Sequence, residues 1–186
     1  MKGIFVTSQS QSTDETQPIE VKLLRSVCGL FVTGVTVITS GGEKRSMGTT
    51  VNSFTSVSLD PPLVLFCLHK DSRLHEVLEE SGMFVVNFLA GRQEKIAWTF
   101  AGKETALLQD VAHHRSAAGM PILSEALAFL ACRLVNRFDG GDHAIFLGEV
   151  VELGAPRRNH EPLIFHRGSL SSLEGDPWAV HPIWDG

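Results

Sequence analysis

The most constraining feature of the sequence is a pair of long, mostly apolar segments joined by a short glycine-containing turn. Residues 126–138 (ALAFLACRLVNRF) and 143–154 (HAIFLGEVVELG) flank the tetrapeptide DGGD at positions 139–142. Glycine readily adopts the positive φ angles that a tight hairpin turn requires. The sequence therefore predicts two long antiparallel strands in this part of the chain.

Other segments are short and rich in β-branched or apolar residues, which is typical of strands. They are residues 34–40, a strand in the stretch that begins at residue 46, and residues 61–68, 83–90 and 161–168. Residues 61–68 (PPLVLFCL) are almost continuously apolar, which predicts a strand that is covered on both faces. With the hairpin, about seven strands are expected.

Three helices are predicted from periodicity and from their end signals. In residues 19–31 the apolar positions recur at helical spacing. These positions are Ile19, Leu23, Leu24, Val27, Leu30 and Phe31. Residues 72–82 begin with Ser72, a favourable N-cap, and end at Gly82, a common helix stop. Residues 92–102 form the third helix.

Residues 103–124 show only weak periodicity, so we expect an irregular excursion there. His113 and His114 lie in it without a spaced third ligand, which favours a solvated loop over a metal site. Helices do not alternate regularly with strands along the chain. The sequence therefore predicts a mainly β fold with flanking helices, an antiparallel barrel rather than a doubly wound parallel sheet.

The length of 186 residues indicates one folded domain. We expect residues 1–17 to form a flexible N-terminal arm, residues 18–170 the domain, and residues 171–186 a C-terminal tail. The three cysteines are far apart, which predicts buried thiols in a reducing cytoplasm. The net charge of −5 gives no reason to expect a nucleic acid or an anionic membrane as a partner.

The stretch SMGTTVNSFTSVSLD is unusually rich in small hydrogen-bonding side chains. Between Thr49 and Ser58 it has six hydroxyl groups, one amide and no charge. Such groups suit a bound anion or a heteroaromatic ring, although serine and threonine are also common in strands and turns. Val51, Phe54 and Val57 are three residues apart, which breaks strict strand alternation and predicts a bulge or bend.

Several common catalytic motifs are absent from the sequence. It has no GxGxxG dinucleotide fingerprint, no Walker phosphate loop, no GxSxG nucleophile elbow and no HExxH metal motif. The sequence therefore indicates neither a protein nucleophile nor a bound metal.

Six motifs occur in order: FVTGVTVITS, GTTVNSFTSVSLDPPLVLFCL, SGMFVVNFL, FAGKE, GGDHAIFLGEV and PLIFHRG. Together they resemble the short-chain flavin reductases, the reductase components of two-component flavin monooxygenases. The resemblance implies a homodimeric, antiparallel split β-barrel that binds FMN or FAD without a Rossmann unit. It also implies hydride transfer from NADH or NADPH to the flavin, and delivery of reduced flavin to a separate oxygenase.

The same resemblance assigns roles to residues of this chain. The flavin ring and ribityl chain are expected against Ser46, Met47, Gly48, Thr49, Thr50, Asn52 and Ser53, with Cys67, Leu68 and His69 closing the site. The phosphate end is expected at Ser72, Arg73 and Leu74, with a further contact from Phe100, Ala101 and Lys103. His143, with Arg167 and Gly168, is expected to hold the nicotinamide, and His143 is the expected catalytic residue.

Two other functions stay open at this stage. The barrel could be an electron carrier that keeps its FMN and never uses NAD(P)H, or it could bind an unrelated apolar ligand. Loss of NADH absorbance with added flavin would favour the reductase. A yellow protein that leaves NADH untouched would favour the carrier, and a colourless protein without flavin affinity would favour the third function.

Overall fold

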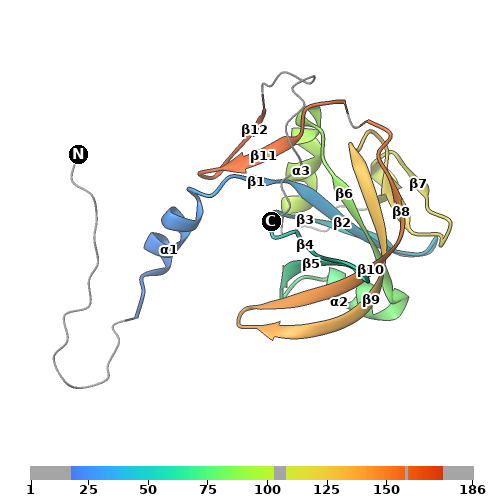
Figure 1. Cartoon of the computed structure of the whole chain (residues 1–186), viewed down its shortest axis with the longest axis horizontal. Coiled ribbons are helices and arrows are strands. Elements are labelled where there is room, and N and C mark those ends of the chain that lie inside the picture. Colours follow the sequence, from blue (N-terminus) through green and yellow to red (C-terminus); the bar gives the residue numbers. More distant parts are fainter. Residues whose placement is uncertain (1–17, 103–107, 158, 174–186) are drawn as a thin grey trace.

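The structure is a computed structural model that describes residues 18–102, 108–157 and 159–173 (Figure 1). The predicted N-terminal arm and residues 174–186 of the predicted tail lie outside the described residues, as does Lys103. The centre of the fold is one antiparallel sheet with helices packed beside it.

The main sheet has seven strands in the order β3-β2-β6-β9-β10-β5-β4. The strands are β2 (Thr36–Gly41), β3 (Ser46–Val51), β4 (Thr55–Leu59), β5 (Pro62–His69), β6 (Met83–Phe88), β9 (Ala128–Gly140) and β10 (His143–Gly154). Every neighbouring pair is antiparallel. Within the described ranges, no hydrogen-bonded pairing joins the outer strands β3 and β4, so the mainly β, antiparallel prediction is confirmed without a closed barrel.

The hairpin that the sequence predicts most strongly is present. β9 and β10 pair from His143 opposite Gly140 to Gly154 opposite Phe129. Gly141 in the connection has φ of 79°, the positive value expected for glycine in a tight turn. Both strands continue far beyond the turn, and this hairpin forms the centre of the sheet.

The hydroxyl-rich stretch is divided into β3 and β4, with a break at residues 52–54. The pairing of β4 with β5 also shifts register between Ser56 and Ser58. The predicted bulge or bend is therefore confirmed. The prediction for β5 was wrong: Val64, Phe66 and Leu68 are buried, but the residues between them are partly exposed, so only one face is fully covered.

Two small sheets lie beside the main one. The first has the order β1-β11-β12, from β1 (Thr33–Gly34), β11 (Leu163–His166) and β12 (Ser169–Ser172). The second pairs β7 (His113–Arg115) with β8 (Pro121–Leu123). The prediction of an irregular excursion was therefore wrong for these residues, and β12 was not predicted, because short strands show little periodicity.

The helices are α1 (Val21–Cys28), α2 (Leu74–Ser81) and α3 (Glu94–Ala101), with the short 3₁₀ turns η1 (Gly91–Gln93) and η2 (Leu108–Asp110). α2 ends as predicted at Gly82, whose φ is 63°. The N-cap prediction was off by one residue. Arg73 occupies that position, while the Ser72 hydroxyl accepts a hydrogen bond from the Leu74 N–H at 3.4 Å.

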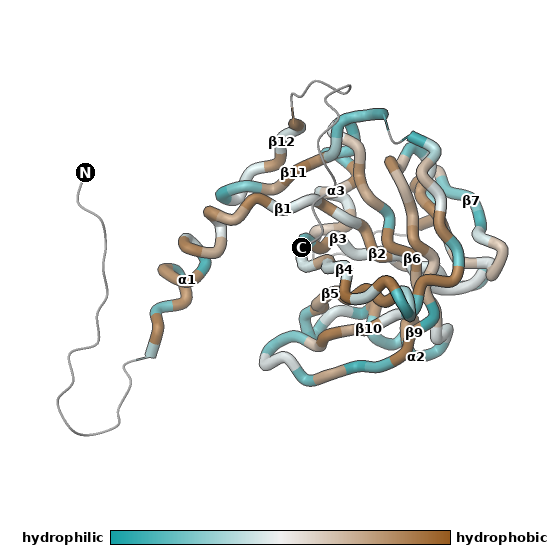
Figure 2. Tube along the Cα trace, in the orientation of Figure 1, coloured by the Kyte–Doolittle hydropathy of each residue, from teal (hydrophilic) through white to brown (hydrophobic). Residues whose placement is uncertain are grey.

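The hydrophobic core lies between the sheet and the helices α2 and α3. Phe66, Phe84 and Phe146 are fully buried in the part that α2 covers, and the rings of Phe66 and Phe146 stack at 5.3 Å. Val37 and Phe100 belong to the part beside α3. α1 has no buried residue, although hydropathy marks several of its residues as hydrophobic (Figure 2).

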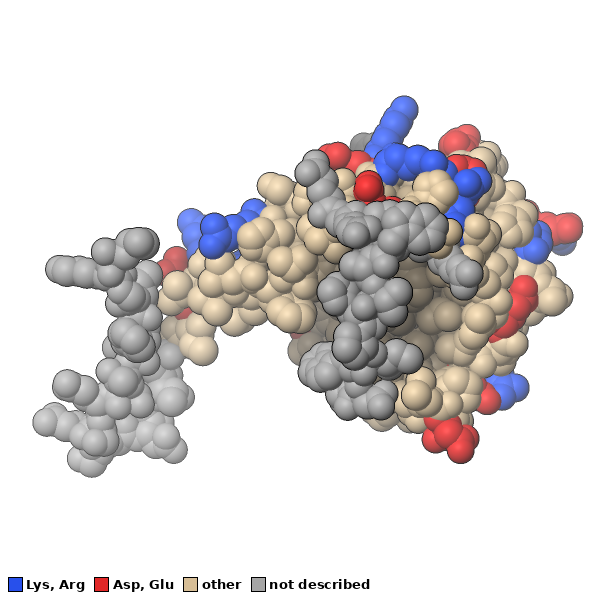
Figure 3. Space-filling model, turned by 45° about the horizontal axis from the view of Figure 1, so that its top comes forward, with Lys and Arg blue, Asp and Glu red and all other residues tan. Residues whose placement is uncertain are grey.

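Charged side chains of both signs are interspersed on the face shown in Figure 3, and the surface between α1 and the body is mostly uncharged there. No helix among the described residues is both long and apolar enough to cross a membrane.

Candidate active site

One cavity of about 880 Å³ gathers residues from four separate segments of the chain. The predicted residues that line it are Met47, Gly48, Thr49, Thr50, Asn52, Ser53, Cys67, Leu68, His69, Ser72, Arg73, Leu74, Phe100 and His143. Val51, Asp71 and Gly102 also line it and were not among the predicted site residues. β3 and β5 provide two walls, and the start of α2 and the end of α3 provide the others.

Two of the hydroxyl groups in this cavity fix its walls. The Thr50 hydroxyl donates a hydrogen bond to the Ala97 carbonyl at 2.7 Å and so ties β3 to α3. The Ser53 hydroxyl donates to the Cys67 carbonyl at 3.0 Å and accepts from the Cys67 N–H at 2.9 Å. These bonds hold the break between β3 and β4 against β5. Some hydroxyl groups of this stretch therefore stabilise the fold through bonds within the chain.

The Thr49 hydroxyl and the Asn52 amide differ from those two groups. Both residues line the cavity, and neither side chain has a hydrogen-bond partner among the described residues. Asn52 is exposed and Thr49 is partly buried. Polar groups in a cavity without protein partners are suited to hydrogen bonding with a ligand.

Gly48 lies where β3 approaches the Phe100 ring. A Cβ atom at Gly48 would be 3.0 Å from two ring atoms of Phe100 and 3.3 Å from Val37. Phe100 is buried, so its ring has little room to move. A side chain at position 48 would therefore disturb this wall of the cavity.

His143 and His69 face each other across the β10–β5 pairing, at one end of the cavity. Their rings are in edge-to-face contact, with centroids 5.2 Å apart. The Asp142 carboxylate lies 2.7 Å from His143 Nδ1, and this hydrogen bond lowers the pKa of Asp142. The carboxylate accepts this bond and so orients the ring, and Nε2 has no hydrogen-bond partner among the described residues.

The start of α2 lies beside this histidine pair, where Ser72, Arg73 and Leu74 line the cavity and the Ser72 N–H donates to the His69 carbonyl oxygen at 2.9 Å. His75 supports this turn, because its Nε2 lies 2.9 Å from the His69 carbonyl oxygen. Arg73 brings a positive charge to this end, and Asp71 a negative one. The wall of the cavity along β3 has no charged side chain.

Five of the predicted site residues do not line this cavity. Ser46 hydrogen-bonds the Gly42 carbonyl at 2.5 Å and lines a smaller neighbouring pocket. Ala101 is exposed outside the cavity, and Lys103 lies outside the described residues. Arg167 and Gly168 form the turn between β11 and β12, where the Arg167 N–H donates to the Gly29 carbonyl at 2.9 Å. A single chain does not bring this turn to the cavity.

The cysteines differ from one another. Cys132 is buried, and burial raises the pKa of its thiol to about 12. Cys67 is partly exposed in the cavity wall. Cys28 is exposed at the end of α1, so the prediction of buried thiols was wrong there. No group of three or more His, Cys, Asp or Glu side chains suited to a metal occurs in the part of the chain that the structure describes.

Comparison with known proteins adds independent information. A family model described as a flavin reductase like domain matches residues 28–174. The chain is 38% identical over 157 residues to HsaB, the reductase subunit of a flavin-dependent monooxygenase of Mycobacterium tuberculosis, which covers 84% of each chain. It is 36% identical over 166 residues to an NADH-dependent FMN reductase of Streptomyces nodosus, with 87% of this chain and 89% of the relative covered.

A solved structure agrees with these sequence relatives. The NADH:FAD oxidoreductase of Streptomyces globisporus, in complex with NAD and FAD fragments, superposes with a TM-score of 0.78 at 38% identity. The match covers 89% of this chain and 100% of that one. Because the family model spans most of the chain and the relatives match over most of their own length, this protein belongs to the flavin reductase-like family.

Proposed function

We propose that this protein is an NADH-dependent flavin reductase that binds FMN or FAD in the 880 Å³ cavity. The observation that carries the proposal is the convergence of β3, β5 and the start of α2 on one cavity that His143 and Arg73 both line. The names of the matched relatives, an NADH-dependent FMN reductase and an NADH:FAD oxidoreductase, favour a reductase over a flavin-retaining carrier.

The lining of the cavity fits a flavin. The uncharged wall along β3 is suited to a neutral aromatic ring and its polyol chain. Arg73 at the start of α2 is suited to the phosphate, because a guanidinium forms strong hydrogen bonds with phosphate oxygens. When bound, the flavin accepts at N5 the hydride that leaves nicotinamide C4, so no protein nucleophile is required.

The residues of this chain would then bind and orient. Backbone N–H groups near Asn52, or the Asn52 amide, would stabilise negative charge that develops on the pyrimidine side of the ring. His143, oriented by Asp142, would hold the nicotinamide amide so that the two rings stack. Arg167 and Gly168 would reach a nicotinamide only from a second subunit or by a movement of their turn, because they lie away from the cavity of their own chain.

The proposal is tested by mixing the full-length protein with NADH and with FMN or FAD, and following NADH absorbance. We expect flavin-dependent loss of NADH that saturates with each substrate. A yellow protein that leaves NADH unchanged would support the carrier instead. Repeating the assay with NADPH determines the preferred nucleotide.

His143 provides a more specific test. We expect His143→Ala to raise the KM for NADH, and to lower kcat, by about tenfold or more because a misplaced nicotinamide reacts slowly. Flavin affinity should stay within twofold of the unmodified protein. Unchanged KM and kcat would show that His143 does not position the nicotinamide.

A homodimer with a split-barrel arrangement forms part of the proposal. α1 exposes its apolar face, and an adjoining hollow of about 830 Å³ is lined by Phe31, Val32 and Phe54 among others. Asn52 and Ser53 line both this hollow and the flavin cavity, so a twofold partner seated there would lie next to the active site. Residues 18–170 would form the subunit, with residues 1–17 as an arm and 171–186 as a tail.

The remaining partner is a separate flavin-dependent oxygenase that receives the reduced flavin, as in the monooxygenase to which HsaB belongs. We place the protein in the cytoplasm, where unpaired thiols such as Cys28 and Cys132 stay reduced. Neither a nucleic acid nor a membrane is part of the proposed function.

A further inference from the structure

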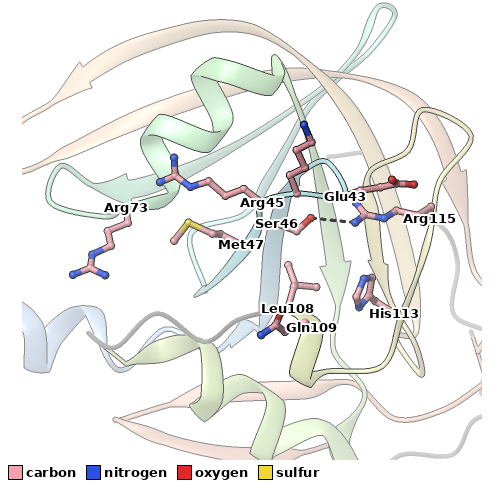
Figure 4. Close-up of a pocket in the computed structure, with 10 residues that line it drawn as sticks. Glu43, Arg45, Ser46, Met47, Arg73, Leu108, Gln109, His113 and Arg115 are labelled. Atoms are coloured by element: carbon pink, nitrogen blue, oxygen red, sulfur yellow. Dashed lines mark hydrogen bonds between the residues drawn. The ribbon is translucent and has the colours of Figure 1, made fainter.

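A second, smaller pocket of about 390 Å³ adjoins the flavin cavity (Figure 4). Met47 and Arg73 line both spaces. The two spaces therefore meet between β3 and the start of α2, which is the end of the cavity proposed for the flavin phosphate. A ligand that extends beyond that phosphate would enter the smaller pocket.

The lining of the smaller pocket is predominantly cationic. Among the described residues that line it are Lys44, Arg45, Arg73 and Arg115, and Glu43 is the one carboxylate in that set. In Figure 4, Arg73 lies on one side, Arg115 on the other, and Met47 between them. Several cations that converge on one space repel one another, so an anion bound there is stabilised.

Arg115 is held in place by neutral groups. Its guanidinium donates to the carbonyl oxygens of Gly41 at 3.0 Å and Gly119 at 2.9 Å, and to the Ser46 hydroxyl at 3.3 Å. These acceptors fix the side chain without cancelling its charge. Arg45 differs, because it pairs with Glu76 at 2.8 Å and is about half exposed, with 47% of its side chain accessible.

The rest of the lining suits an adenine ring. Met47 and Leu108 are buried and give the pocket apolar walls. Gln109 is exposed at the pocket, and a glutamine amide can form paired hydrogen bonds with N6 and N7 of adenine. An apolar wall, an amide and a cluster of cations together match an adenosine phosphate.

We infer that the pocket of Figure 4 receives the adenylate half of FAD, so that this protein selects FAD over FMN. The inference rests on the proposed function, since it requires the riboflavin phosphate half to lie in the larger cavity. FMN would occupy the larger cavity alone. FAD would place its second phosphate among Arg73, Arg45 and Lys44, and its adenine near Gln109.

The test is a calorimetric titration of the full-length protein with riboflavin, FMN and FAD in the absence of NADH. We expect FAD to bind about tenfold more tightly than FMN, because its second phosphate and its base add contacts in the smaller pocket. FMN should in turn bind more tightly than riboflavin.

Two arginines provide a matched pair of variants. Arg45 forms ion pairs with Glu76 and Glu80 of α2, and Arg137 forms one with Glu79 of the same helix, but only Arg45 lines the smaller pocket. We expect Arg45→Gln to raise the Kd for FAD about fivefold, while the Kd for FMN changes less than twofold. Arg137→Gln should change neither value.

The possible outcomes separate this inference from the proposed function. Equal affinity for FMN and FAD, or equal weakening of both by Arg45→Gln, would overturn the inference and leave the reductase function intact. Failure of riboflavin, FMN and FAD to bind would overturn the proposed function, and the inference with it.

Discussion

The helices α1 and α2 have the same length and similar apolar spacing, but their environments are opposite. α2 buries Leu74, His75, Val77 and Leu78 against the sheet, whereas α1 buries nothing. On α1, Leu24 is 50% exposed, and Phe31, just beyond its end, is 74% exposed. An amphipathic pattern shows that a face will be covered, but it does not show whether the cover comes from the same chain. We therefore assign α2 to the core of the subunit and α1 to the proposed interface.

The largest expected effect comes from shortening a buried side chain of α2. Leu78 has no exposed surface, so Leu78→Ala should lower the free energy of unfolding by about 2–5 kcal/mol through lost burial and an added cavity. Urea denaturation measures the loss, which should not depend on protein concentration. A loss below about 1 kcal/mol would mean that α2 contributes no more to the hydrophobic core than α1 does.

The corresponding change on α1 should act on assembly. Leu24→Asp places a charge on the exposed apolar face and should weaken the proposed dimer at least about tenfold, since buried interface side chains carry much of the binding energy. Sedimentation over a range of concentrations measures the dimer Kd. Lys22→Asp, on the polar side of the same helix, is the control and should have a smaller effect. A wild-type protein that sediments as a monomer would contradict the assignment of α1.

Substituting alanine for the glycine that follows each helix should change stability by a smaller amount, and the two positions should differ. Gly82 after α2 has φ of 63°, whereas Gly29 after α1 has φ of −65°. Alanine at position 82 should cost about 1–2 kcal/mol, because a side chain is strained in the left-handed region. Alanine at position 29 avoids this backbone strain and only brings its Cβ to 3.1 Å from the Arg25 carbonyl oxygen, so thermal unfolding should show the larger loss at position 82. The reverse order would contradict the backbone conformations.

The smallest effect concerns pH. Cys132 packs in the same core cluster as Val77 and Leu78 of α2, and burial raises the pKa of its thiol to about 12. The folded state therefore holds this proton more tightly than the unfolded state does. The corresponding stability is complete below the unfolded value near 9 and is lost as pH rises through the folded value. At about pH 10 the loss should be about 1 kcal/mol.

Cys132→Ala isolates this pH effect. The variant should start less stable, because it leaves a small cavity, but its unfolding free energy should fall less steeply above pH 9 than that of the wild type. Urea denaturation at several pH values measures the two slopes. Equal pH slopes of the unfolding free energy in the two proteins would show that burial under α2 does not raise the pKa of the thiol.

Much of the cavity lining was predicted from the family resemblance that the sequence motifs carry. The residues of GTTVNS and CLH line one cavity because β3 and β5 place them there, and Arg73 and His143 line it from the start of α2 and of β10. The sequence did not distinguish Thr50 and Ser53, whose hydroxyls bond to the backbone of the same chain, from Thr49 and Asn52, whose side chains have no partner among the described residues. Hydrogen-bond partners distant in sequence are set by packing and are invisible to composition.

The sequence by itself determined the antiparallel hairpin of β9 and β10, the stop of α2 at Gly82 and the bend after β3. Each of these depends on local conformational preference or on the period of apolar residues, which neighbouring residues alone specify. Only the tertiary structure decided that α1 stands exposed, that β5 is covered on one face, that Ser46 turns away from the flavin cavity, and that Arg45, Arg73 and Arg115 converge beside it. These features depend on contacts between residues far apart in the chain, and such contacts exist only once the sheet and helices have packed together.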